Sequence, residues 1–125
     1  MKKILVTGSG GIGGVNFVRA LRVTKEKFFI VGTDFNQYYL EFPDVDVRVN
    51  TPRHSDSQFI PLIKKTISKY SIDFIHPQPS SEALVISEDA ELKQKTFLPN
   101  SSIISHDKLT TQKILSENNL PVART

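Results

Sequence analysis

Residue types that can bind an anion gather in one loop near the amino terminus, Thr7-Gly8-Ser9-Gly10-Gly11-Ile12-Gly13-Gly14, which holds five of the six glycines in the chain. Glycine leaves no Cβ between the backbone amides and a ligand, and it permits positive φ angles. An apolar run at residues 4–6 precedes the loop, and apolar residues at helical spacing follow it. The loop should therefore join a buried strand to a helix, whose first amides favour phosphate or carboxylate.

The same loop satisfies two nucleotide-binding patterns. Gly8, Gly10 and Gly13 fit G-x-G-x-x-G, and Asp34 follows at the end of the next apolar run. The dinucleotide fingerprint places its ribose-binding acid about 20 residues after the glycines, which matches this position. The T-G-x-x-G-x-x-G spacing of extended short-chain dehydrogenases is also present, beginning at Thr7. Taken alone, the loop predicts NAD binding, although a tight strand-to-helix turn also serves nucleotide-free α/β domains.

Apolar runs alternate with amphipathic segments along the whole chain. Strands are expected at residues 4–6, 28–34, 45–49, 72–77 and 96–98, with helices at 15–21, 57–70, 80–92 and 107–118. This alternation predicts an α/β fold, a three-layer, Rossmann-like, doubly wound parallel sheet with the strand order 3-2-1-4-5. The third strand alternates valine with charged residues, which suits an edge position.

Three charged side chains follow the carboxyl ends of expected strands: Asp34, Arg53 and Glu82. Ligands of open α/β sheets bind outside these ends, so all three are candidate binding residues. If no ligand binds here, Arg53 lies in a solvated loop, and Glu82 makes a favourable contact with the dipole of its helix. The aromatic loop at residues 35–43 either caps the sheet edge or forms a wall for an adenine or substrate ring.

Composition narrows the class of protein. The 125 residues suit one domain, and the net charge of +3 comes with lysines scattered along helices, so no nucleic-acid surface is expected. The chain has no cysteine, signal peptide or membrane-length apolar run, which predicts a cytoplasmic protein that binds no membrane. A P-loop lysine, a nucleophile–base pair and metal-ligand spacing are all missing, so neither catalytic residues nor a metal site are expected.

The last residues carry the most distinctive pattern. They resemble the D-K-x-x-T-x-x-x-L-x-E-N-G-I-P-V-P-x-T segment that joins the N-terminal domain of ATP-grasp enzymes to their ATP-binding domains. The residues that carry the resemblance are Asp107, Lys108, Leu115, Glu117, Asn118, Leu120, Pro121, Val122 and Thr125. Asn119 stands where the family has glycine, and asparagine is the second choice for a left-handed helix end. Ala123 replaces the second proline.

The glycine loop and residues 31–34, 75–77 and 82–84 also follow one another in the order found in this family. Together with the last residues, they make the chain resemble the pre-ATP-grasp domain of carbamoyl-phosphate-synthase-like carboxylate–amine ligases. The resemblance implies such a domain at residues 1–106. Residues 107–125 would be a helix and linker leading to an ATP-grasp domain, on the same or a partner chain. In this family ATP phosphorylates a carboxylate to an acylphosphate, and an amine displaces the phosphate.

The resemblance also implies which ligands this chain binds and which bind elsewhere. ATP and Mg²⁺ would bind mainly outside this chain, which alone would bind no cofactor and have no activity. The chain would supply a substrate- or phosphate-binding set, made up of Gly8, Ser9, Gly10, Gly11, Asp34, Arg53 and Glu82. Loop amides would face substrate or phosphate, and Asp34 and Glu82 would present carboxylates to an amine or hydroxyl. Arg53 would face a small-molecule carboxylate.

Two alternatives stay open at this point. One is a fragment of an NAD-binding oxidoreductase of the short-chain dehydrogenase or epimerase kind, with Asp34 on the ribose. The other is a stand-alone regulatory module that binds a small ligand.

Overall fold

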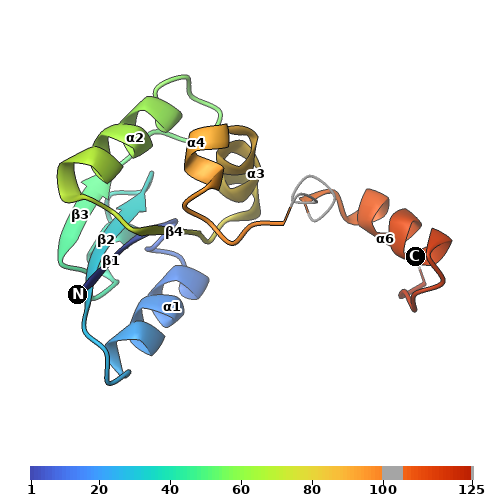
Figure 1. The fold of residues 1–125 in the computed structure, drawn as a ribbon, viewed down its shortest axis with the longest axis horizontal. Coiled ribbons are helices and arrows are strands. Elements are labelled where there is room, and N and C mark those ends of the chain that lie inside the picture. Colours follow the sequence, from blue (N-terminus) through green and yellow to red (C-terminus); the bar gives the residue numbers. More distant parts are fainter. Residues whose placement is uncertain (100–105, 125) are drawn as a thin grey trace.

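Ten elements follow one another along the chain in a computed structural model that describes residues 1–99 and 106–124 (Figure 1). The strands are β1 (Lys2–Thr7), β2 (Phe28–Asp34), β3 (Val47–Asn50) and β4 (Phe74–Pro77). The helices are α1 (Ile12–Arg22), the 3₁₀ turn η1 (Tyr39–Glu41), α2 (Phe59–Tyr70), α3 (Ser80–Glu88), α4 (Ala90–Lys93) and α6 (Lys108–Glu117).

The four strands form one parallel sheet in the order β3-β2-β1-β4. Its central strand, β1, pairs with β2 from Lys2 opposite Phe28 to Thr7 opposite Thr33, and with β4 on its other side. The parallel order of the first four strands and the edge position of β3 confirm the sequence-based prediction. The carboxyl ends of β1, β2 and β4 all lie at one edge of the sheet, where the glycine loop emerges.

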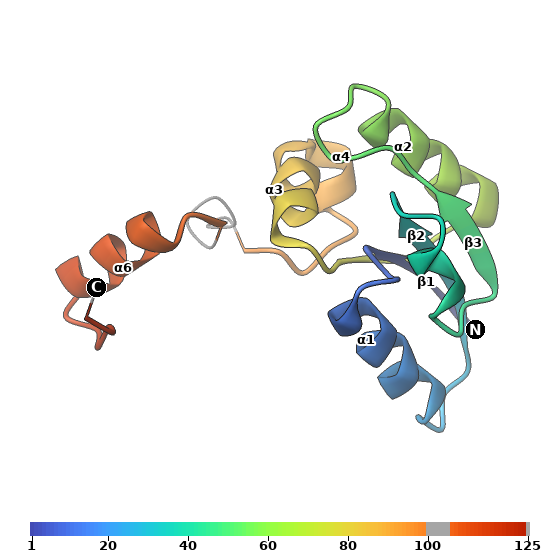
Figure 2. The same ribbon diagram turned by 180° about the vertical axis from the view of Figure 1, so that it is seen from behind.

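Helices cover both faces of the sheet, which gives the three predicted layers (Figures 1 and 2). On one face α1 buries Val18 against Ile4, Val6 and Ile30. On the other, α2, α3 and α4 enclose a larger apolar core. The buried members of this core are Leu5, Val31, Phe59, Ile63, Ile67, Ile72, Ile75, Ile86 and Leu92. Alternate residues of β1 and β2 therefore point to opposite cores, as a sheet buried on both sides requires.

The expected fifth strand is not formed. Lys95 O accepts a hydrogen bond from the Ile75 amide, so the chain passes beside β4, but residues 96–98 are not part of the sheet. The Leu98 amide turns back to the hydroxyl of Thr96, and Pro99 has no amide to give to a ladder. Phe97 packs its ring on Phe74 with centroids 4.6 Å apart and stays exposed.

The helix expected over residues 80–92 is divided into α3 and α4. Asp89 leaves the helical conformation, and its carboxylate accepts the Leu92 amide, so it caps α4. Ser80, a residue type common at N-caps, does not cap α3, because the helix begins at Ser80 after Pro79. Pro79 offers no capping side chain, and the Ala83 amide bonds to its carbonyl.

The terminal helix α6 begins and ends as its sequence predicts. Asp107 caps it by accepting the amides of Leu109 and Thr110. Asn119 follows it with φ 59°, which confirms the predicted left-handed residue. No residue of α6 is buried, so Leu115, which its place in the helix would make the best-placed core contact, does not reach a core. In both views α6 lies apart from the sheet and its helices (Figures 1 and 2), and Thr125 lies outside the described residues.

Within the described ranges, no helix combines the length and the apolar character needed to cross a membrane.

We predict that Gly14→Ala destabilises the domain whereas Gly11→Ala does not. A Cβ at Gly14 would lie 2.5 Å from Gly8 O and 2.6 Å from the Ser9 Cα, which are backbone atoms that cannot move independently. A Cβ at Gly11 meets only Gly8 O at 3.6 Å. Overpacking of this kind costs about 1–3 kcal/mol, whereas the Gly11 variant should stay within about 1 kcal/mol of the parent.

Urea unfolding of the two variants measures this difference directly. Equal losses of unfolding free energy in both variants would contradict the close contact between α1 and the glycine loop.

Candidate functional site

The glycine loop is tied into the protein by its own amides. Ser9 N donates to Thr33 O at 2.9 Å, Gly10 N to Asp34 Oδ2 at 3.0 Å, and Gly11 N to Gly8 O at 3.3 Å. These three amides therefore do not face a substrate or phosphate, which corrects the expectation for them. Ser9 is fully buried, and its hydroxyl also donates to Thr33 O.

Most loop glycines make room for protein atoms. A Cβ at Gly8, which has φ +59°, would collide with the Pro79 ring, and one at Gly13 with the Gln78 side chain. A Cβ at Gly10 would lie 2.5 Å from the Tyr39 backbone. In the dinucleotide fingerprint the second glycine lets the pyrophosphate approach the backbone, but here η1 occupies that space. Of the glycines in the loop, only Gly11 has no close neighbour of this kind, because a Cβ there would meet Gly8 O at an ordinary contact distance of 3.6 Å.

Asp34 belongs to the same hydrogen-bond network. Its Oδ2 accepts the Gly10 amide, its Oδ1 accepts the Asn36 amide at 2.9 Å, and the residue is 5 % exposed. Both oxygens of the expected ribose-binding acid thus hold the protein's own backbone. The carboxylate still contributes negative charge to the space next to it.

That space is a small pocket at the carboxyl edge of the sheet, with a volume of about 240 Å³. It is lined by Gly8, Gly11, Asp34, Phe35, Tyr39, Pro79 and Glu82. The structure therefore brings together four of the seven predicted binding residues. Arg53 lies outside the lining, with its guanidinium 4.3 Å from the centre of the Phe35 ring. Ser9 and Gly10 do not line the pocket either.

Glu82 is the unusual group of this pocket. It sits in the first turn of α3, directly after β4, and is 3 % exposed. Its Oε2 has no hydrogen-bond partner in the described part of the chain. Burial raises the pKa of its carboxyl from 4.5 to about 7; the Thr7 hydroxyl beside it acts in the opposite direction, and the nearby charge of Asp34 raises the pKa further. A buried acceptor without a partner is costly, so it marks a place where a ligand can bind.

Three buried threonines at this edge of the sheet were not among the predicted binding residues. The hydroxyls of Thr7, Thr33 and Thr51 are buried, and none makes a hydrogen bond of ordinary geometry among the described residues, although the Thr7 hydroxyl lies close enough to the Glu82 carboxyl to lower its pKa. They come from the carboxyl ends of three adjacent strands, and Thr7 and Thr33 face each other in register. The signal was present in the strand alternation: Leu5 and Val31 point into the larger core, and two residues later each strand places a threonine on the same face.

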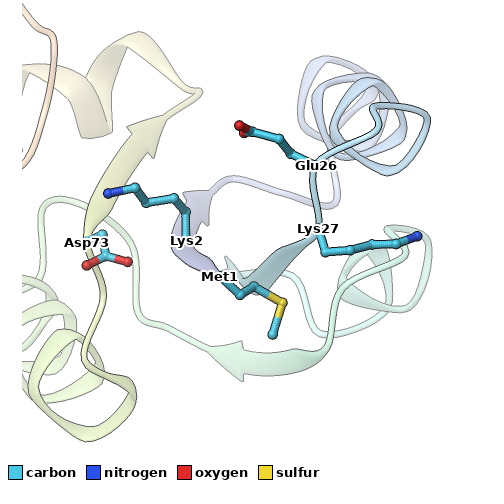
Figure 3. A pocket seen from close by; sticks show the side chains of 5 residues that line it. All are labelled: Met1, Lys2, Glu26, Lys27 and Asp73. Atoms are coloured by element: carbon cyan, nitrogen blue, oxygen red, sulfur yellow. The ribbon is translucent and has the colours of Figure 1, made fainter.

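A larger hollow of about 620 Å³ lies at the opposite, amino ends of the strands (Figure 3). Its charged side chains belong to Lys2, Glu26, Lys27 and Asp73, and Figure 3 shows them pointing in different directions rather than toward one centre. Ligands of open α/β sheets bind at the other edge, so this hollow is not the candidate site. Across residues 1–99 and 106–124, no three histidine or acidic side chains are grouped to hold a metal ion.

Comparison with known proteins identifies the fold. No protein-family model and no curated protein sequence matches the chain. The structure is similar to an L-amino acid ligase from Bacillus licheniformis, with TM-score 0.72 and 16 % sequence identity, over 98 % of this chain and 31 % of the ligase. The chain thus spans about a third of that protein's length. A dTDP-glucose 4,6-dehydratase from Bacillus anthracis, solved with NAD, matches over 94 % of this chain and 34 % of its own, with TM-score 0.49 and 16 % identity.

The chain therefore has a Rossmann-like α/β fold with a parallel sheet in the order 3-2-1-4, shared with part of a ligase.

We predict that Glu82→Gln removes a pH dependence of stability. Between pH 4.5 and about 7 the folded protein keeps a proton that the unfolded chain has released, so the free energy of unfolding falls as pH rises. The loss amounts to at most about 3 kcal/mol and is complete above the folded pKa. The glutamine variant lacks this loss, so it is the more stable protein at pH 8.

Urea unfolding at pH 4.5, 6 and 8 provides the measurement. Glu88→Gln is the matched control, because Glu88 is an exposed carboxylate on the same helix and its variant should keep the parent's pH profile. Parallel profiles for the parent and Glu82→Gln would contradict the buried, desolvated carboxyl.

Proposed function

We propose that this chain is the N-terminal, substrate-side domain of an ATP-grasp carboxylate–amine ligase, and that its pocket holds the amine substrate. The single observation that carries the proposal is the buried carboxyl of Glu82, which faces the pocket beside Asp34 without a hydrogen-bond partner for Oε2. The assignment to the carbamoyl-phosphate-synthase-like branch rests on the sequence resemblance.

Two further observations support the proposal. The fold is shared with part of an L-amino acid ligase, over almost the whole of this chain. The tail has the predicted helix, its Asp107 cap and the left-handed Asn119, at the places where the ATP-grasp linker pattern requires them. Neither of these observations identifies a substrate, so the choice of the amine comes from the pocket.

The pocket's charge favours a cation. Two carboxyl groups, Asp34 and Glu82, line it, and the aromatic residues Phe35 and Tyr39 form part of its wall. Arg53 lies outside the lining, with its guanidinium held over the Phe35 ring. An ammonium group supplies the hydrogen bonds that Glu82 Oε2 lacks, and its charge favours the ionised carboxylate. A substrate carboxylate would instead meet two acids.

In the proposed reaction, a carboxylate oxygen bonds to the terminal phosphorus of ATP and ADP leaves. The bound ammonium group first releases one proton to become a free amine. The amine nitrogen then bonds to the acyl carbon, phosphate leaves, and the nitrogen loses a second proton. The described residues of this chain do not fit ATP or Mg²⁺, because they include neither a phosphate-binding lysine loop nor a metal-binding cluster. Both ligands are assigned to an ATP-grasp domain, on the same or a partner chain, and this chain alone is expected to be inactive.

The hydrogen bonds of the loop argue against the NAD alternative. A ribose-binding acid must offer its oxygens to the ligand, and here both oxygens of Asp34 accept protein amides. The backbone of Tyr39 lies against Gly10, where the pyrophosphate would approach. A nicotinamide cofactor would have to displace η1 and break both hydrogen bonds.

We predict that glycinamide, a small amine without a carboxylate, binds the pocket and that Glu82→Gln weakens this binding about 10- to 100-fold, the value of a charged hydrogen bond. NMR titration should show saturable shifts at Gly8, Gly11 and Glu82. Affinity should fall as pH drops below about 7, because protonated Glu82 carries no charge.

Acetamide is the control ligand and Glu88→Gln the control variant. Equal binding of acetamide, or unchanged affinity in Glu82→Gln, would contradict the amine site.

A separate titration tests the oxidoreductase alternative. We expect no saturable change in NADH fluorescence at millimolar concentrations. The reason is that both oxygens of Asp34, the expected ribose-binding acid, already accept protein amides. Micromolar NADH affinity that is lost in Asp34→Ala would replace the ligase proposal with a dinucleotide site.

A further inference from the structure

Another hollow adjoins the glycine loop, between α1 and η1. Its volume is about 470 Å³, within the range of small-molecule pockets. Gly11 and Tyr39 line both this hollow and the pocket of Glu82, so the two spaces are neighbours. We call this space the α1–η1 hollow.

One wall of the α1–η1 hollow is a single stripe of α1. Ile12, Val15, Asn16 and Arg19 follow the i, i+3, i+4, i+7 spacing and line the hollow together. Val18, on another face of the helix, is buried against the sheet. Ile12 is 85 % exposed, so it contributes little to the core. The stripe thus places apolar surface toward the start of the helix and polar groups toward its end.

The opposite wall consists of two aromatic rings on a fixed backbone. The rings of Tyr39 and Phe42 have centroids 6.2 Å apart, and the two residues are 52 % and 68 % exposed. Arg48 holds the backbone behind them by donating to Leu40 O at 2.9 Å and to Pro43 O at 3.0 Å. Two aromatic rings that stay exposed on a pinned turn form a preorganised apolar surface.

The charge of the hollow favours a monoanion. The side chains of Arg19 and Asn16 have no hydrogen-bond or ion-pair partner in the described part of the chain, and no acidic residue lines the hollow. Arg22, one turn later, is by contrast bound to Asp46 at 3.0 Å and to Phe28 O. A guanidinium pairs with a carboxylate through two parallel hydrogen bonds, and one positive charge matches one carboxylate better than a doubly charged phosphate.

We propose that the α1–η1 hollow binds a small carboxylate with an aromatic or branched apolar body. The body lies between Ile12 and the rings of Tyr39 and Phe42, and the carboxylate pairs with Arg19. This inference stands apart from the ligase assignment, because it uses neither Glu82 nor the linker pattern. The charges also separate the two spaces, since the acid-lined pocket repels the ligand that the α1–η1 hollow attracts.

NMR titration of the 125-residue chain with 3-phenylpropionate tests the proposal. We expect saturable shifts at Ile12, Val15 and Phe42 with an affinity of roughly 1–10 mM for a probe of this size. Arg19→Gln should weaken binding about tenfold or more, which is the value of a charged hydrogen bond. The neutral 3-phenylpropionamide and the ringless propionate should each bind at least about tenfold more weakly.

Lys25→Gln is the matched control, because it removes an exposed positive charge after the same helix and should leave the affinity unchanged. Equal binding of the amide probe, equal losses in both variants, or shifts centred on Glu82 would overturn the proposal. So would a concentration-dependent dimer that Phe42→Ala dissociates, together with no probe binding, since the hollow would then be an interface between two copies. These outcomes are independent of glycinamide binding, so this proposal and the ligase proposal can fail separately.

Discussion

The hydrogen bond from the Gly10 amide to Asp34 Oδ2 joins the glycine loop after β1 to the end of β2. It sets the position of the loop, and the Asn36 amide on Oδ1 begins the segment that leads to η1. Tyr39 then packs its backbone against Gly10 at a distance that only glycine permits. These contacts fill the space above Gly10, and Gly11 lines both the Glu82 pocket and the α1–η1 hollow. The glycine-rich sequence thus serves close packing first and ligand binding second.

In the Glu82 pocket, the buried carboxyl that would bind a ligand lowers the stability of the fold. A carboxyl group that is 3 % exposed, with one oxygen unpaired and Asp34 close by, costs stability whenever it is ionised. The threonine hydroxyls at the ends of β1 and β2 are buried and unpaired in the same region. Local conflicts of this kind in an otherwise consistent fold are typical of functional sites. A ligand that donates hydrogen bonds at this place removes part of the cost.

The fold was predictable where local patterns and packing agree. The unit from β1 to β2 follows from the glycine loop between two apolar runs, and Asn119 follows from the chemistry of left-handed helix ends. The absence of the fifth strand could not be predicted from the sequence. The hydrogen bond beside β4 and the turn at Thr96 depend on tertiary contacts that a short apolar run does not reveal. Four of the seven predicted binding residues share a pocket, since strand ends meet at one edge of the sheet. The use of the loop amides by Asp34 and Thr33 was invisible in the sequence, because the fingerprint spacing is the same whether the acid binds a ribose or the loop itself.

A carbon-13 NMR titration of the Glu82 side-chain carboxyl, with and without saturating glycinamide, measures whether this carboxyl is a buried acid that binds an amine. The free chain should titrate at this carboxyl with a pKa of about 7, and the bound ammonium should lower this pKa. A Glu82 carboxyl that titrates near the ordinary value of 4.5 and does not respond to the amine would rule out the buried, amine-binding acid.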